Sequence, residues 1–248
     1  MMTPEQRFIF DVQGYIIIPG VLAPERVQRM VADMEEHGVG EVENGWSKAR
    51  FHSFLSWGEE WRALIDVPII LPILFELLGP RFRLDHAYGM AMRADEKDEG
   101  EGLHHHAGMF YHGSYYVTHG EKMHNGLVVV SYALTDIEPG MGGFACIPGS
   151  HKALYPVPDG WFQLEGNPMV QQIPQKAGDV LIFTESLTHG TMPWRDKHHD
   201  RRSVLMKFCP HYMQWSKWKM PTEIEGLTER QKLILQEPYV ADREKVEE

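Results

Sequence analysis

The stretch 177–190 reads AGDVLIFTESLTHG and combines a largely apolar run with a histidine. Residues 179–183 form a short apolar run that follows Gly178, which is typical of a buried β-strand. His189 comes soon after the end of this run. We therefore predict a buried strand that is followed in the sequence by a candidate functional histidine.

Comparable runs lie on both sides of this stretch. They predict further strands at 15–18, 81–93, 126–134, 142–148 and 203–208. Within 81–93, apolar residues recur at every second position apart from a slip at His86, which predicts one buried face. That face consists of Phe82, Leu84, Tyr88, Met90 and Met92.

Helices are expected mainly before residue 80. Residues 22–37 carry apolar side chains three and four positions apart, which indicates a helix with one core-facing stripe of Val27, Met30, Val31 and Met34. One or two short helices are expected at 64–78. Short strands between Gly- and Pro-rich loops, with helices in front of them, indicate a mainly β sandwich or open barrel with an N-terminal helical cover.

No repeat or linker divides the 248 residues, so we expect one domain over 1–248. It would comprise a helical cap (about 1–80), a barrel (about 81–210) and a tail (211–248) that is frayed from residue 242 onward.

Composition limits the possible partners. The net charge of −11 and the absence of a basic patch argue against a nucleic-acid partner. The most apolar window, 64–78, is interrupted by Asp66, Pro68 and Pro72 and is shorter than the ~20 apolar residues of a membrane span. Two cysteines and no recognisable secretion signal favour a cytoplasmic protein. A chain of this length can enclose a site for a small-molecule substrate. The oligomeric state cannot be inferred.

Histidine is abundant, with 14 copies, and three stand together at 104–106. Imidazole is the commonest protein ligand for transition metals. In an extended segment His104 and His106 project to the same side, so they could bind one ion. His189 could supply a third ligand and leave coordination positions open for a substrate and O₂.

Several motifs, in this order, resemble those of the phytanoyl-CoA dioxygenase-like family. They are NGLVVVS (125–131), PGMGGF (139–144), IPGSHK (147–152), AGDVLIF (177–183), THGT (188–191) and RRS (201–203). The likeness covers nearly the whole chain and thins after Pro210. It implies a double-stranded β-helix, the jelly roll of cupin-like proteins. It also implies Fe(II) as cofactor, with 2-oxoglutarate and O₂ as cosubstrates.

The resemblance also assigns roles to residues. His104 matches the first metal ligand and His189 the distal ligand, while Arg202 matches the arginine that binds the far carboxylate of 2-oxoglutarate. A guanidinium suits that task because it binds a carboxylate through two parallel hydrogen bonds and stays charged. The neighbouring Arg201 is expected on the opposite side of the strand, as a surface charge. Thr191 and Tyr88 could add hydroxyl contacts to the cosubstrate.

One departure leaves the third ligand open, because the family has Asp or Glu where this chain has His106. His106 could itself complete a three-histidine site with His104 and His189. Alternatively the position stays open, as in related halogenating enzymes, which would suit a register with His105 as ligand and Ala107 in the carboxylate slot. A third possibility is that His119 and Glu121 supply a His-x-Glu pair.

The predicted function is that of a non-haem Fe(II)- and 2-oxoglutarate-dependent dioxygenase that hydroxylates a small organic substrate. Three alternatives stay open. They are a three-histidine metalloenzyme that does not use 2-oxoglutarate, a halogenase-like variant, and a binding relative without catalytic activity.

Overall fold

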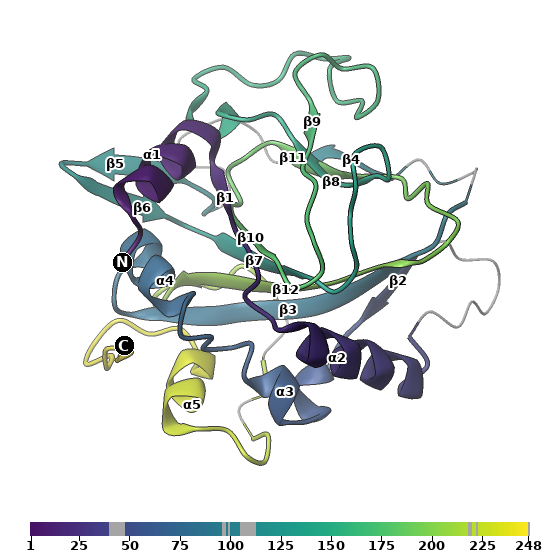
Figure 1. Cartoon of the computed structure of the whole chain (residues 1–248). Coiled ribbons are helices and arrows are strands. Elements are labelled where there is room, and N and C mark those ends of the chain that lie inside the picture. The colour runs from purple at the N-terminus through teal and green to yellow at the C-terminus, as the bar shows by residue number, and fades with distance from the viewer. Residues whose placement is uncertain are drawn as a thin grey trace.

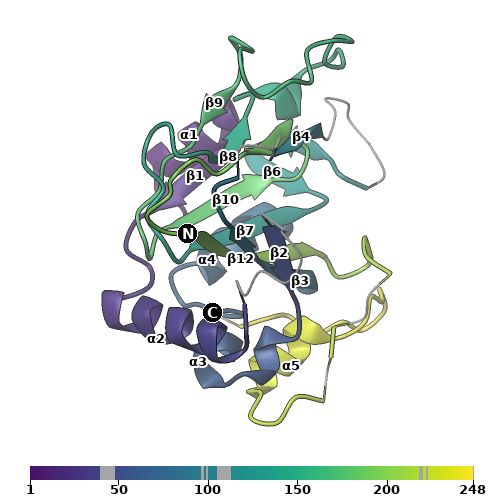
Figure 2. The same cartoon turned by 90° about the vertical axis from the view of Figure 1, so that its right-hand side faces the viewer.

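The computed structural model describes residues 1–39, 48–95, 98, 100–104, 113–217, 220–221 and 223–247. Its centre is a pair of antiparallel sheets stacked on each other, with helices packed on the outside of the larger sheet (Figures 1 and 2). This is the mainly β jelly roll with helical cover that the sequence predicts.

The larger sheet has six strands, and strands from distant parts of the chain are neighbours in it. In spatial order they are β1 (Tyr15–Ile18), β10 (Val180–Thr184), β7 (Val128–Ala133), β12 (Arg201–Pro210), β3 (Phe82–Met92) and β2 (Lys48–Phe51). Both edge strands come from the first 80 residues. The N-terminal region therefore contributes to the barrel as well as covering it.

A smaller sheet faces the larger one. Its strands, in spatial order, are β4 (Glu101–His104), β11 (His189–Met192), β8 (Gly143–Cys146) and β9 (Gln171–Gln172). A separate hairpin, β5 (Tyr116–His119) and β6 (Lys122–Asn125), projects at one side (Figure 1).

In the described part of the chain, four helices lie on the outer side of the larger sheet (Figure 1), namely α2 (Pro24–Glu36), α3 (Glu59–Arg62), α4 (Leu71–Leu78) and α5 (Glu229–Leu235). Helix α1 (Pro4–Gln13) lies beside β1 and the β5–β6 hairpin instead, and the 3₁₀ turns are η1 (Phe54–Ser56) and η2 (Ser150–Lys152). Val27, Met30 and Met34 of α2 are buried as the spacing predicts, and Val31 packs partly against the same core. No helix among the described residues is long and apolar enough to cross a membrane.

Strand β3 contains a β-bulge, beyond which its alternation of side chains between the two faces is reversed. Its pairing with β12 runs Lys207 to His86 and then Phe208 to Leu84, so Asp85 has no residue opposite it. A bulge of this kind reverses which side chains face which way. Phe82 and Leu84 pack in the core shared with the helices, whereas the side chains after the bulge, at Tyr88, Met90 and Met92, form a separate cluster. The expectation that these five residues share one face is wrong.

The end of the chain is also more ordered than expected. Val246 is buried, and its N–H donates to the carbonyl of Pro80. The Arg81 side chain donates to the carbonyl of Arg243. The expected fraying from residue 242 is therefore wrong for the described residues up to 247.

The IPGSHK motif ties α1 to the barrel. The Gly149 N–H donates to the carbonyl of Gln13, and the Nε2 of His151 donates to the carbonyl of Asp11. His151 is 4% exposed, and its Nδ1 has no partner among the described residues. A second proton on this ring would be buried without an acceptor. Burial, helped by the neighbouring charge of Lys152, lowers the pKa of His151 to about 4.

This depressed pKa predicts acid destabilisation. The folded protein holds His151 neutral while the unfolded chain takes up a proton near pH 6.5, so stability falls as the pH drops from about 7 to about 4. The loss should approach about 3 kcal/mol. Urea unfolding at pH 7, 5.5 and 4 checks this. In His151→Gln, whose amide is able to donate to the same carbonyl, the slope over this range should flatten. An unchanged slope would contradict the assignment.

Candidate metal centre

The structure brings His104 and His189 together from distant parts of the chain. His104 ends β4, His189 begins β11, and the two are direct partners across the smaller sheet. Their ring centroids lie 4.4 Å apart. The predicted convergence of the two imidazoles is confirmed, and their role as metal ligands stays a prediction.

Both rings are oriented by backbone carbonyls. The Nδ1 of His189 lies 2.6 Å from the carbonyl oxygen of Leu187, and the Nδ1 of His104 lies 3.0 Å from that of Gly102. A carbonyl oxygen only accepts, so each Nδ1 donates its proton, and Nε2 is the ring nitrogen that would bind a metal. This is the arrangement by which proteins usually orient metal-binding histidines.

A buried carboxylate lies beside the two imidazoles. Glu185 follows β10 directly, is 1% exposed, and offers an oxygen within 4.8 Å of ligand nitrogens on both His104 and His189. Sequence reasoning missed Glu185. The available signal was an acidic side chain at the end of an otherwise apolar strand, four residues before the candidate histidine.

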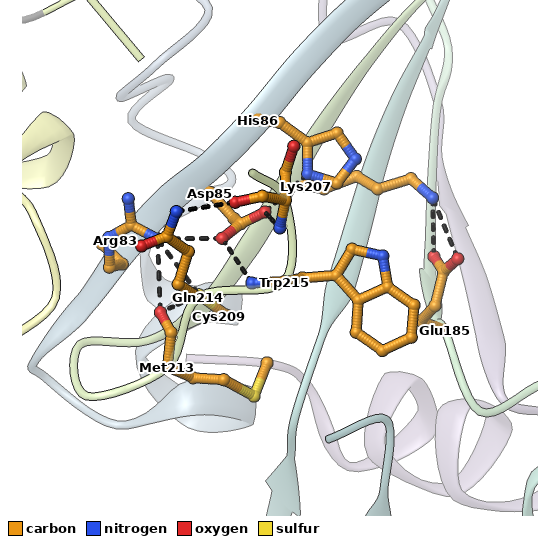
Figure 3. A network of polar contacts seen from close by, with 10 residues as sticks. Arg83, Asp85, His86, Glu185, Lys207, Cys209, Met213, Gln214 and Trp215 are labelled. Atoms are coloured by element: carbon orange, nitrogen blue, oxygen red, sulfur yellow. Dashed lines mark hydrogen bonds and ion pairs between the residues drawn. The ribbon is translucent and has the colours of Figure 1, made fainter. Parts of the chain in front are cut away.

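Glu185 is paired with Lys207 of β12. The Nζ of Lys207 lies 2.9 and 3.0 Å from the two carboxylate oxygens, as Figure 3 shows. Lys207 is 8% exposed. Its burial alone would lower its pKa, but the attraction of Glu185 outweighs burial, and the pKa of Lys207 lies above its ordinary value. The pair is therefore a buried ion pair at the edge of the candidate centre.

The two arginines at the start of β12 lie on opposite faces, and the inward one is Arg201. Arg202 faces α2, where its guanidinium lies 2.9 Å from a carboxylate oxygen of Glu35. Arg201 is 4% exposed, so its expected role as a surface charge is wrong. The structure therefore does not bring Arg202 to the histidines.

Arg201 is a buried cation with no salt-bridge partner among the described residues, although the charge of Glu101 acts to raise its pKa. Within the described part of the chain, its Nη1 contacts the sulfurs of Met90 and Met92, at 3.5 and 3.3 Å, and its Nε has no partner. Burial lowers the pKa of Arg201 to about 10. Gly143 of β8 makes room for it, because a Cβ there would lie 3.2 Å from the Nε of Arg201. A buried guanidinium in this state is suited to an anionic ligand.

The remaining predicted residues lie at varied distances from this group. Thr191 follows His189 on β11 and is half-buried. Tyr88 lies on β3, with the Nζ of Lys207 6.0 Å from its ring centroid. His119 and Glu121 are exposed at the tip of the β5–β6 hairpin, outside the His104–Glu185–His189 group. His105, His106 and Ala107 fall outside the described residues.

The fold and the donor set together define a jelly-roll protein with a candidate metal centre. The family model for phytanoyl-CoA dioxygenase (PhyH) matches residues 10–203, and the chain belongs to this family. No curated protein sequence matches it.

Solved structures share the fold at low sequence identity. HygX from Streptomyces hygroscopicus with nickel and 2-oxoglutarate bound is 22% identical, with a TM-score of 0.76 over 92% of this chain and 95% of that one. Iron-bound HygX is 23% identical, with a TM-score of 0.74 over 91% and 94%. SnoN, a non-haem α-ketoglutarate-dependent epimerase from nogalamycin biosynthesis, is 21% identical, with a TM-score of 0.63 over 96% and 93%.

Proposed function

We propose that this protein is a non-haem Fe(II)- and 2-oxoglutarate-dependent oxygenase that hydroxylates a small organic substrate. The observation that carries the proposal is the buried guanidinium of Arg201, which has no salt-bridge partner among the described residues. Membership in the PhyH family supports the same cofactor and cosubstrates. So do the solved structures of HygX that hold iron, or nickel and 2-oxoglutarate.

The donor chemistry of the centre fits ferrous iron. Two neutral imidazoles and a carboxylate are the set that non-haem Fe(II) oxygenases use, with the remaining positions open. His104 and His189 would hold the metal through Nε2, because their Nδ1 protons are engaged by carbonyls. The rings of Phe144 and Phe183, with centroids 5.6 and 4.8 Å from that of His189, help to exclude water.

The position of Arg201 fits a dicarboxylate. Gly143, which faces its guanidinium, pairs with Met192 of β11, while Cys146 pairs with His189. The guanidinium therefore lies three residue pairs from the imidazole, ~10 Å along the strands. This spacing suits a cosubstrate with one end at the metal and the other at Arg201. We assign the anchoring role to Arg201 instead of Arg202.

The residues of the chain then bind and orient, and the iron supplies the oxidation. When bound, the metal would activate O₂ and couple the decarboxylation of 2-oxoglutarate to substrate hydroxylation. Arg201 would fix the far carboxylate, and Thr191 and Tyr88 are proposed to contribute hydroxyl contacts to the cosubstrate.

Anaerobic titration with Fe(II) tests the proposal. Adding 2-oxoglutarate to the Fe(II)-loaded protein should produce the visible absorption band of iron chelated by a 2-keto acid, and air should then release succinate. Tight Fe(II) binding without this band would favour a metalloenzyme that does not use 2-oxoglutarate and would overturn the proposal. Failure to bind Fe(II) would overturn it in favour of a non-catalytic relative.

A further inference from the structure

We infer that Glu185 supplies the carboxylate ligand of the metal centre, and that Lys207 compensates its charge while the metal is absent. The inference rests on the proposed function, which it extends by naming the third ligand. It begins from a gap in this chain, since the family pattern has an acidic residue two positions after the first ligand and this chain has His106 there.

The geometry selects Glu185. Among the described residues, it provides the carboxylate that clusters with the nitrogens of His104 and His189, all within 4.8 Å of one another. An octahedral ion brings its ligand atoms to ~3 Å from their neighbours, because each metal–ligand bond is ~2 Å long.

The backbone between Glu185 and His189 is held firmly, so the two side chains keep a fixed relation. The Glu185 N–H donates to the carbonyl of Leu127 on the neighbouring strand, and the Leu187 N–H donates to that of Thr184. The Thr188 N–H donates to the Oγ of Ser150, 2.8 Å away. A buried turn with these bonds presents both groups to the same point, which is the preorganisation a metal site needs.

The pairing with Lys207 leaves Glu185 able to bind a metal. A carboxylate has about four lone-pair sites on its two oxygens. Lys207 contacts each oxygen once, at 2.9 and 3.0 Å, so the pairing itself takes up only one of these sites on each oxygen. A ligating carboxylate held by a second hydrogen-bonding group is a common feature of metal centres.

Lys207 also explains how an empty centre tolerates a buried charge. A buried carboxylate without a partner is costly, and removing one member of a buried ion pair strongly destabilises a protein. Lys207 avoids this cost in the metal-free protein. Lys207 is thus a positioning residue, and its removal should make the protein depend on the metal for stability.

Co(II) binding under anaerobic conditions tests the inference, with affinity from calorimetry and geometry from the cobalt absorption spectrum. The key variant is Glu185→Gln combined with Lys207→Met, since the double change leaves no buried unpaired charge. Its Co(II) affinity should fall by roughly 100-fold and its spectrum should change. His106→Ala is the matched control and should change the affinity little.

Lys207→Met alone should increase the stabilisation that Co(II) gives to the protein. Its metal-free form should melt at a lower temperature than the wild type, and Co(II) should raise its melting temperature by more than it raises that of the wild type. Glu185→Gln should show a smaller rise. If the ion pair were purely structural, both single variants would melt at a lower temperature. Co(II) would then not raise the melting temperature more in Lys207→Met and less in Glu185→Gln than in the wild type.

The outcomes separate the two proposals. If His106→Ala loses Co(II) binding and the Glu185→Gln/Lys207→Met variant keeps it, the inference is overturned and the three-histidine site takes its place. A smaller Co(II)-induced rise in Lys207→Met than in the wild type overturns the role of Lys207. If His189→Ala binds Co(II) as tightly as the wild type, the metal centre itself is misplaced and the proposed function fails with it.

Discussion

Arg201→Met is expected to raise the KM for 2-oxoglutarate by about 100-fold, because a buried charge-assisted contact that loses one partner costs ~2–5 kcal/mol. Arg202→Met is expected to change it by no more than about fivefold, since the Arg202 guanidinium pairs with Glu35 of α2 on the opposite face of β12. The measurement is succinate release at varied 2-oxoglutarate concentration. The same ranking should appear in the concentration of 2-oxoglutarate that half-saturates the visible band of the Fe(II) protein.

Stability provides the control for this comparison. Arg201 contacts only Met90 and Met92 through Nη1 and leaves its Nε without a partner among the described residues, so it gains little from the folded protein itself. Replacing a buried polar group of this kind by a thioether removes a desolvation cost. Arg201→Met should therefore unfold at a temperature no lower than the wild type without 2-oxoglutarate. Lost binding with retained stability is typical of a ligand site.

The opposite ranking would contradict the assignment. If Arg202→Met raises the KM and Arg201→Met does not, the anchoring arginine is the outward-facing one. Arg201→Lys refines the result, because lysine keeps the charge but lacks the planar fork that binds a carboxylate through two bonds. It should bind 2-oxoglutarate more tightly than Arg201→Met and less tightly than the wild type.

The sequence contained the information needed to choose between the two arginines. On β12, the positions that share a face with Arg202 are Val204, Met206 and Phe208, and all three pack in the core with the helices. The positions that share a face with Arg201 include the polar Ser203 and Lys207. A buried strand with one polar face indicates an interior site on that face. The RRS motif alone does not show which arginine faces the interior, because it contains two adjacent arginines.

Some features of the site could be predicted from the sequence, and others could not. The convergence of His104 and His189 could be predicted because motif order fixes which strands become neighbours. The proximity of Glu185 to Lys207 depends on contacts between residues 22 positions apart, and no local pattern reports it. The reversal of side-chain faces along β3 likewise depends on a bulge at Asp85. In the sequence this bulge appears only as one break in the alternation of apolar residues, at His86.

Asp85→Asn is expected to lower the free energy of unfolding by about 3 kcal/mol or more, in the range of ~3–5 kcal/mol typical of a broken buried ion pair. Asp85 is fully buried at the bulge of β3. Its Oδ1 accepts from Arg83 at 2.9 Å and from the Trp215 N–H at 2.8 Å. Its Oδ2 accepts from His86 at 2.6 Å and from the Ser216 N–H at 2.9 Å. Figure 3 shows this network beside the Glu185–Lys207 pair.

The amide cannot replace the carboxylate in these contacts. An amide has one acceptor oxygen, so its NH₂ group would face a second pair of donors, and Arg83 would stay buried without a countercharge. The segment from Met213 to Ser216, which is tied to the sheet through Asp85, should loosen first. Hydrogen–deuterium exchange at Trp215 and Ser216 should therefore rise in the variant by more than exchange in the central strands.

The pH dependence of the free energy of unfolding provides a further test of the role of the Asp85 carboxylate. Burial would raise the pKa of Asp85, but the hydrogen bonds from His86, Trp215 and Ser216 outweigh it, and the pKa lies below its ordinary value. The stabilisation is therefore complete above the ordinary pKa of ~4 and is lost as the pH falls through the folded value. Asp85→Asn should lack this acid loss, which begins below the range assigned to His151.

Asp200→Asn is the matched control, because Asp200 pairs with Arg93 at 3.0 Å while the Arg93 side chain is half exposed to solvent. Solvent screens that pair, so its loss should cost no more than about 1 kcal/mol. Chemical unfolding at pH 7 compares the two variants directly. Equal losses would show that burial does not strengthen the Asp85 contacts, and the network would then be an incidental feature of the fold. A much larger loss in Asp85→Asn would mean that the bulge is held in place by this carboxylate, and with it the face of β3 on which Tyr88 and Met90 lie.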